Sequence, residues 1–292
     1  MTVYPVRVRH STTVPILLVL VSILGQQLGA SLAATLFGSV GPQGMVMMRL
    51  LFSALIMVAI LRPALRAITG SGWLTVLALG ATMTGMNLMI YEAFDRIPQG
   101  IAVTIEALGP LTLSVLTGRR LLGLLWAFLA LAGVGTLGRD GFDAVDGLDP
   151  VGVAFALGAA ACWAGFIMMN RRAGRVLPGA QGLALAMCVG SLVVVPLGTA
   201  SAGAALLDPW VLAVGVGIAL LSSAIPYGIE TRVLQRLHAS TFSILTCLSP
   251  VMAALTAFVV LGQRLELLDL VAMLLVIVAC AGAVRTRPAT PA

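Results

Sequence analysis

Ten apolar runs, most of them long enough to cross a lipid bilayer, take up nearly the whole of this 292-residue chain. A membrane-spanning helix needs about 20 apolar residues, and a helix satisfies its backbone hydrogen bonds within its own segment. The segments between the runs are short. The pattern therefore predicts an all-α membrane protein with ten transmembrane helices. The runs lie near residues 14–37, 44–62, 72–94, 98–117, 121–138, 150–170, 180–200, 209–231, 240–261 and 267–284.

The composition excludes a soluble globular protein. Charged residues make up 10% of the chain, whereas a soluble domain carries about 25%. The net charge of +6 would indicate a nucleic-acid partner in a soluble protein. Here the basic residues separate apolar runs. We therefore expect the protein to lie in a lipid bilayer and to bind no nucleic acid. The cysteines lie in apolar runs without close pairing and are expected to be small core residues: Cys162, Cys188, Cys247 and Cys280.

The basic residues, all 17 of them arginines, predict the orientation in the membrane. With the N-terminus in the cytoplasm, thirteen arginines fall in cytoplasmic segments and three (Arg96, Arg139 and Arg264) in outer ones, while Arg49 lies inside the second run. Cytoplasmic loops of membrane proteins carry such an excess of arginine. We therefore predict a multi-pass protein of the bacterial inner membrane with both termini in the cytoplasm. The first apolar run continues to Phe37, so we expect it to be retained rather than cleaved as a signal peptide.

The two halves of the chain resemble each other. Residues 96–98 and 109–110 (Arg-Ile-Pro, then Gly-Pro) align with residues 236–238 and 249–250 (Arg-Leu-His, then Ser-Pro) at a constant offset of 140. A repeat of five helices is odd, so the second copy must be inverted in the membrane, as in many carriers. The predicted parts are a cytoplasmic N-terminus (1–13), a first five-helix repeat (14–138), an outer acidic loop (139–149), a second five-helix repeat (150–284) and a cytoplasmic tail (285–292).

Glu106 is the residue on which the functional interpretation depends. It lies ~12 Å inside the fourth run, where a charged group is costly and normally faces a cavity or a partner. Pro110 has no amide hydrogen for the carbonyl of Glu106, so a carboxylate and a free carbonyl share one helical turn. Such a turn can hold a proton or a substrate ammonium group. The alternative is a structural Glu106 that is bonded to a neighbouring helix.

Pro250 predicts the same helix break in the second half, where Thr246 takes the place of Glu106. Arg49 can bind a substrate carboxylate or Glu106, or extend toward the membrane surface. Glu230 ends its run beside two arginines, and an ion pair at the membrane surface explains it without a functional role. The other polar residues at depth are candidates for the wall of a substrate pocket or for hydrogen bonds between helices: Gln27, Asn87, Tyr91, Trp163, Tyr227 and Thr246.

Enzyme motifs are absent from the sequence. It has no HExxH, CxxC or GxSxG pattern and no Walker A loop, so we predict no catalytic activity, no cofactor and no metal. The only histidines, His10 and His238, lie at the ends of apolar runs, where a buried serine could not use them as a base.

A series of short motifs follows the chain in order. They are Ala30-Ser-Leu-Ala33 with Leu36-Phe37, Arg49-Leu50, Gly85-Met-Asn87 with Tyr91, Pro98-x-Gly-Ile-Ala-Val103 with Glu106 and Gly109-Pro110, Ala156-Leu-Gly-Ala159 with Ala161-Cys-Trp-Ala164 and Arg172-Ala-Gly174, Pro226-Tyr227 with Glu230, and Leu261-Gly262. This order resembles the drug/metabolite transporter superfamily with paired EamA-type halves. Within it the sequence is most similar to the threonine/homoserine exporter family.

The resemblance implies a secondary transporter that exports small neutral amino acids such as threonine and homoserine by proton antiport with alternating access. It also implies that Glu106 and Glu230 are family features, which makes Glu230 a second acidic site. One residue departs from the family pattern, because Gln263 stands where the family has Glu. An exporter of drugs or other metabolites on the same scaffold is the alternative, and a membrane-embedded enzyme or structural protein is a remote one. The exact substrate, the stoichiometry and the oligomeric state are not predicted.

Overall fold

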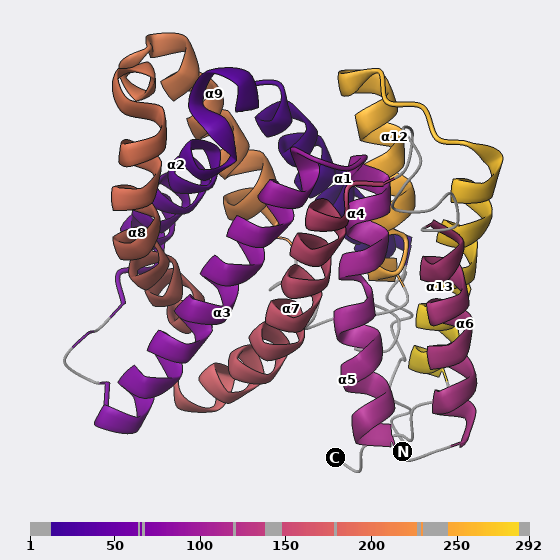
Figure 1. The fold of residues 1–292 in the computed structure, drawn as a ribbon. Helices are drawn as coiled ribbons and strands as arrows, with labels where there is room; N and C mark the ends of the chain where they lie inside the picture. Colours follow the sequence, from indigo (N-terminus) through magenta and orange to yellow (C-terminus); the bar gives the residue numbers. More distant parts are fainter. Residues whose placement is uncertain are drawn as a thin grey trace, which may run out of the picture.

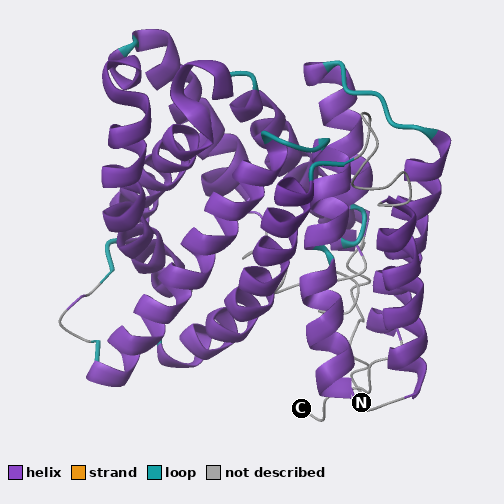
Figure 2. Ribbon diagram, in the orientation of Figure 1, coloured by secondary structure: helices purple, strands orange, loops and turns teal. Residues whose placement is uncertain are grey.

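The computed structural model describes residues 13–63, 65, 68–118, 121–137, 148–177, 180–226, 229 and 245–285. Within these ranges the chain consists of helices and connecting turns, without a strand (Figure 2). The predicted all-α class is therefore confirmed. Five helices are long and apolar enough to cross a membrane, and three further apolar helices are shorter. The count of ten spans and their inverted arrangement stay predictions.

The helices follow one another in two sets. The first set is α1 (Thr13–Ala34), α2 (Phe37–Leu61), α3 (Gly70–Phe94), α4 (Gln99–Glu106), α5 (Leu108–Gly118) and α6 (Leu121–Leu137). The second set is α7 (Pro150–Val176), α8 (Gln181–Ala202), the 3-10 segment η2 (Gly203–Leu207), α9 (Pro209–Ala219), the π-helical segment η3 (Leu220–Ala224), α12 (Ser249–Leu261) and α13 (Leu267–Arg285).

Local sequence explains where several helices begin and end. Asp149 and Asp208 each accept a hydrogen bond from the backbone amide two residues later, and a proline follows each of them. An aspartate cap followed by proline at the first helical position is a strong start signal. Gly262 ends α12 with a φ of 66°, a left-handed conformation that glycine adopts without strain. These helix ends are thus fixed by the sequence itself.

The beginning of α2 differs from the sequence-based expectation. The apolar pattern predicts a helix from residue 44, but α2 begins at Phe37. Only two residues separate it from the end of α1. Gly41 interrupts the helix with a φ of 69°, and Pro42 follows it. A proline removes one backbone hydrogen bond, so the first turns of α2 are set at an angle to the rest. Glycine and proline therefore bend this helix where the apolar pattern suggests that it starts.

Helices of the first set pack mainly against helices of the second. The most extensive contacts join α2 to α8, α3 to α7, α6 to α13, α3 to α8 and α1 to α12. Figure 1 shows the resulting bundle, in which α7 lies beside α3 and α13 beside α6. The two halves are thus interlocked rather than built as separate lobes. Side chains from both halves can therefore meet in the interior.

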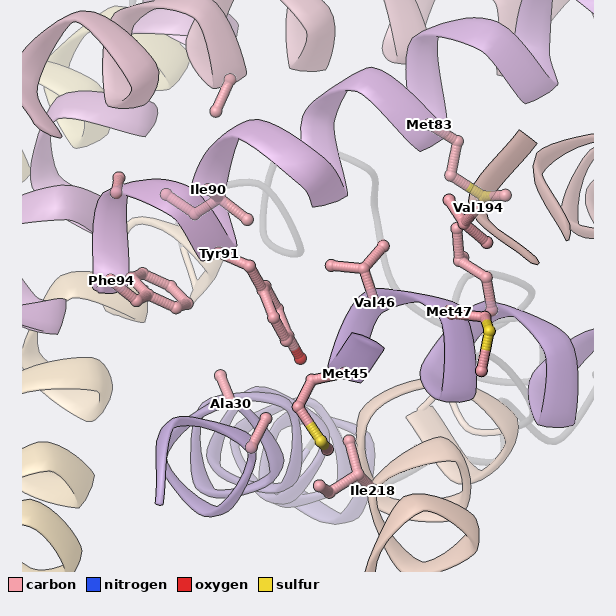
Figure 3. Close-up of a cluster of buried hydrophobic side chains, with 14 of the residues drawn as sticks. Ala30, Met45, Val46, Met47, Met83, Ile90, Tyr91, Phe94, Val194 and Ile218 are labelled. Carbon is pink, nitrogen blue, oxygen red and sulfur yellow. The ribbon is translucent and has the colours of Figure 1, made fainter. Parts of the chain in front are cut away.

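The interior of the bundle is dense in methionine and aromatic side chains, while its outside is apolar. Tyr91 is fully buried, and Figure 3 shows its ring extending from α3 toward Met45, beside Phe94 of its own helix. On the outside, Phe128 and Leu192 expose 72% and 77% of their surface. Large exposed apolar side chains on so many helices are suited to lipid and would make a soluble protein aggregate.

Candidate functional site

Glu106 lies at a break between two helices. Helix α4 ends at Glu106, Ala107 forms a turn, and α5 begins at Leu108. Pro110 in the first turn of α5 has no amide hydrogen to give to the Glu106 carbonyl. The other seven residues of α4 are buried, whereas the Glu106 side chain is half-buried. Glu106 is therefore the one residue of α4 that is not classed with its buried interior.

Arg49 of α2 brings a positive charge to Glu106. The Arg49 guanidinium lies within electrostatic range of the Glu106 carboxylate. Its Nη1 donates a hydrogen bond of 3.2 Å to the hydroxyl of Tyr91, and its Cζ lies 5.6 Å from the centre of the Tyr91 ring. Phe37 and Phe94 flank that ring at 5.8 and 5.7 Å. Tyr91 is thereby held rigidly and positions the guanidinium.

Helix α7 forms another side of the site. The Cys162 thiol is close enough for the Glu106 charge to act on it. Trp163 follows Cys162 in the chain and is half-buried. Asn87 is buried in α3 and donates a 2.8 Å hydrogen bond to the Met83 carbonyl of its own helix. The structure thus brings Glu106, Arg49 and Tyr91 together, whereas the amide nitrogen of Asn87 is engaged within α3.

The second proline-linked break lies against the first. Cys247 and Leu248 form a turn before α12, whose first turn contains Pro250, and Thr246 precedes this turn half-buried. Ala107 and Cys247 belong to one buried cluster, and the Cys280 thiol of α13 donates to the Ala107 carbonyl at 3.8 Å. Both helix interruptions therefore meet in the interior. In other carriers, such interrupted helices bind substrates near the middle of the membrane.

Two predicted site residues, Tyr227 and Glu230, lie outside the described residues. Another predicted site residue, Gln27, lies within the described part of the chain and is hydrogen-bonded to Gln99 of α4. Sequence reasoning missed Gln99, as well as Ser31 and Thr256, which lie beside it. One signal was available, because Gln99 and Glu106 are seven residues apart and therefore lie on the same face of α4.

Gly109 allows α5 to approach α7 beside the break. A Cβ at this position would overlap the carbonyl oxygen of Ala160 and lie 2.9 Å from its carbonyl carbon. We predict that Gly109→Ala lowers the free energy of unfolding by about 1–3 kcal/mol, because rigid backbone atoms cannot move aside. Thermal denaturation of the purified protein in detergent measures this as a lower midpoint. Gly217→Ala in α9 is the matched control, since no atom lies within 4 Å of its Cβ position; equal midpoints for the two variants would contradict the prediction.

A separate ion pair lies at the C-terminal end of α3. Arg96 contacts Glu92 through Nη1 and Oε2 at 2.6 Å, and its Nε lies 3.9 Å from Asp149. Gln43 of α2 donates to Glu92 at 3.4 Å. These contacts join α2, α3 and the start of α7, which accounts for Glu92 as a structural residue. Glu92 is therefore a suitable control residue for substitutions of Glu106.

Apolar helices that enclose a carboxylate, a guanidinium and two helix breaks define a multi-pass membrane protein with the interior of a carrier. The EamA-like transporter family matches residues 150–285 of the chain. The threonine/homoserine exporter RhtA of Escherichia coli (strain K12) is 36% identical over 272 residues, which cover 93% of this chain and 92% of that protein. The RhtA of Salmonella typhimurium (strain LT2) is 35% identical with the same coverage.

The chain therefore belongs to the EamA-like transporter family, and the resemblance that the sequence motifs indicated is confirmed. A solved crystal structure also matches with a TM-score of 0.59 at 20% identity, over 94% of this chain and 97% of its own. At this identity the match shows a shared fold. The relatives are named as transporters, which places this chain in a class of membrane transporters.

Proposed function

We propose that this protein exports small neutral amino acids of the threonine and homoserine type from the cytoplasm in exchange for protons. The observation that carries the proposal is the pair of opposite charges, Glu106 and Arg49, at one enclosed place. An amino acid at neutral pH carries an ammonium and a carboxylate group, which complement this pair. The relatives at 36% identity, which are named threonine/homoserine exporters, support this substrate class.

The proposed cycle depends on competition at Glu106. With the site open to the cytoplasm, the ionised carboxylate binds the substrate ammonium, and Arg49 binds the substrate carboxylate. Once the site opens to the outside, a proton takes the place of the ammonium group. Because proton and substrate use the same carboxylate, the binding of one weakens the binding of the other, and an inward proton gradient drives export.

Alternating access of this kind requires the predicted topology. In this proposal ten spans form two inverted five-helix halves in the inner membrane, with both termini in the cytoplasm. The two helix breaks at Ala107 and Cys247 then lie near the middle of the bilayer. Trp163 and Thr246 border the substrate from α7 and from the second break. Glu230 stays a candidate for a second acidic site.

The purified protein in liposomes tests the proposal. We expect radiolabelled threonine to accumulate when the liposome interior is more acidic than the exterior, because protons leaving the liposome exchange for the amino acid. A protonophore should abolish the accumulation. Lysine, whose side chain adds an unmatched positive charge, should compete poorly. Transport of lipophilic cations without transport of threonine would contradict the proposal and indicate a drug exporter on the same scaffold.

A further inference from the structure

A cluster of polar side chains lies around Gln99, at the first residue of α4. The side-chain nitrogen of Gln99, Nε2, donates to the backbone carbonyl and to the side-chain oxygen of Gln27, at 3.1 and 3.3 Å. The Ser31 hydroxyl lies 2.8 Å from the Gln99 side-chain oxygen and 3.0 Å from the Thr256 hydroxyl. The backbone amide of Gln99 donates to the side-chain oxygen of Gln263 at 3.0 Å. We call these five residues the Gln99 cluster.

The Gln99 cluster joins the two halves of the chain. Gln27, Ser31 and Gln99 belong to α1 and α4, whereas Thr256 belongs to α12 and Gln263 to the segment that follows it. Figure 1 shows α12 next to α1 and α4, and both pairs of helices are in contact. Gln99 and Ser31 have no exposed surface. The cluster is thus a buried polar connection between segments that are far apart in sequence.

The cluster lies between Glu106 and the side that the arginine pattern assigns to the outside. Gln99 and Glu106 are the first and last residues of α4, so they are two turns or about 10 Å apart on one helix face. One residue further, a Cβ at Gly100 would lie 3.0 Å from the Ala254 Cβ. The backbone of α4 therefore lies directly against α12 beside the cluster.

We propose that the Gln99 cluster is the outer gate of the carrier, which closes the Glu106 site to the outside and opens once in each transport cycle. The inference rests on the proposed exporter function. Hydrogen bonds between helices contribute little each, and water can replace them when the helices separate. Two bonds of the cluster, Ser31 to Thr256 and the Gln99 backbone amide to Gln263, cross between the halves and hold the closed state, yet each can break without a large barrier. An apolar contact of the same area would expose apolar surface to water each time the gate opens.

Accessibility of a reporter cysteine tests the gate. Val103 lies between Gln99 and Glu106 on α4 and is buried, so Val103→Cys reports access from either side. A charged, membrane-impermeant methanethiosulfonate is added to intact cells or to inverted vesicles, and the protein without the reporter gives the background. In the reporter protein, Gln99→Ala should raise labelling from outside about tenfold, because it removes the side-chain bonds to Gln27 and Ser31 and so releases Ser31, which bonds Thr256 of the other half. Labelling from the cytoplasmic side should fall, because the closed population decreases.

Two substitutions at Gln263 should move the gate in opposite directions. Gln263→Ala removes one bond to the start of α4 and should raise labelling from outside. Gln263→Glu places a carboxylate at the positive end of α4, which strengthens the bond to the Gln99 amide and should lower labelling from outside. Gln43→Ala is the matched control, since Gln43 hydrogen-bonds Glu92 within the first half and should leave labelling unchanged.

Two results would overturn the gate. One is labelling from outside that none of the variants at Gln99 and Gln263 changes. The other is an increase from both sides in Gln99→Ala with no change in the Gln263 variants, which indicates loosened packing instead of a gate. The measurement needs no transported substrate, so the gate and the proposed function can fail separately. Reciprocal labelling in a protein that does not transport threonine would support the gate and reject the substrate.

Discussion

Replacing Glu106 with glutamine is expected to abolish the response of transport to a proton gradient while the protein stays folded in the membrane. Glutamine has nearly the shape of glutamate but binds no proton and attracts an ammonium group weakly. Hydrogen bonds to charged groups contribute about 1.5–3 kcal/mol, so the apparent affinity for threonine should fall roughly tenfold to a hundredfold. Threonine uptake into liposomes, with and without an acidic interior, measures both effects.

Glu92→Gln is the matched control for this experiment. Glu92 is the same residue type in a neighbouring helix, and its carboxylate is paired with Arg96 at 2.6 Å. We expect this variant to keep gradient-driven uptake, because the carboxylate is engaged by Arg96 at the C-terminal end of α3. Gradient-driven uptake that persists in Glu106→Gln at the rate of the unaltered protein would disprove the coupling role of Glu106.

The arrangement of the helices could be predicted only in part from the sequence. Long apolar runs identify helices in a membrane protein because lipid leaves the backbone no other partners. They do not identify neighbours, because a helix that is apolar all round has no polar face to indicate which side is buried. The pairing of α2 with α8 and of α3 with α7 is therefore visible only in the structure. It follows from close packing across glycines such as Gly198 of α8, which lies against Met47 of α2, and Gly165 of α7, which lies against Thr82 of α3.

The candidate site shows a similar division. Glu106 can be found from the sequence because a carboxylate in an apolar run is costly and needs a reason. Ser31 and Thr256 give no such signal, since hydroxyl groups can bond to carbonyls of their own helix at little cost. Their importance lies in the contacts of Ser31, which bonds both Gln99, 68 residues away along the chain, and Thr256, 225 residues away. Only the folded chain brings them together.

Replacing Arg49 with methionine should make the carrier insensitive to the substrate carboxylate. If Arg49 binds that group, Arg49→Met lowers the affinity for threonine roughly tenfold to a hundredfold, because it removes a charge-assisted and forked hydrogen bond. The amine that remains when threonine loses its carboxyl group should bind the variant and the unaltered protein with the same affinity. Competition of each compound against radiolabelled homoserine in liposomes measures the four affinities.

These four affinities form a cycle that separates the two roles of Arg49. Should Arg49 only balance the charge of Glu106, its loss would weaken threonine and the amine by the same factor, and the coupling between them would vanish. Carboxylate recognition instead predicts a coupling of at least about tenfold. Arg49→Lys should recover part of the threonine affinity, since lysine keeps the charge without the forked geometry. Tyr91→Phe, which removes the hydroxyl 3.2 Å from Arg49 Nη1, should weaken threonine less than Arg49→Met does, because the guanidinium itself remains.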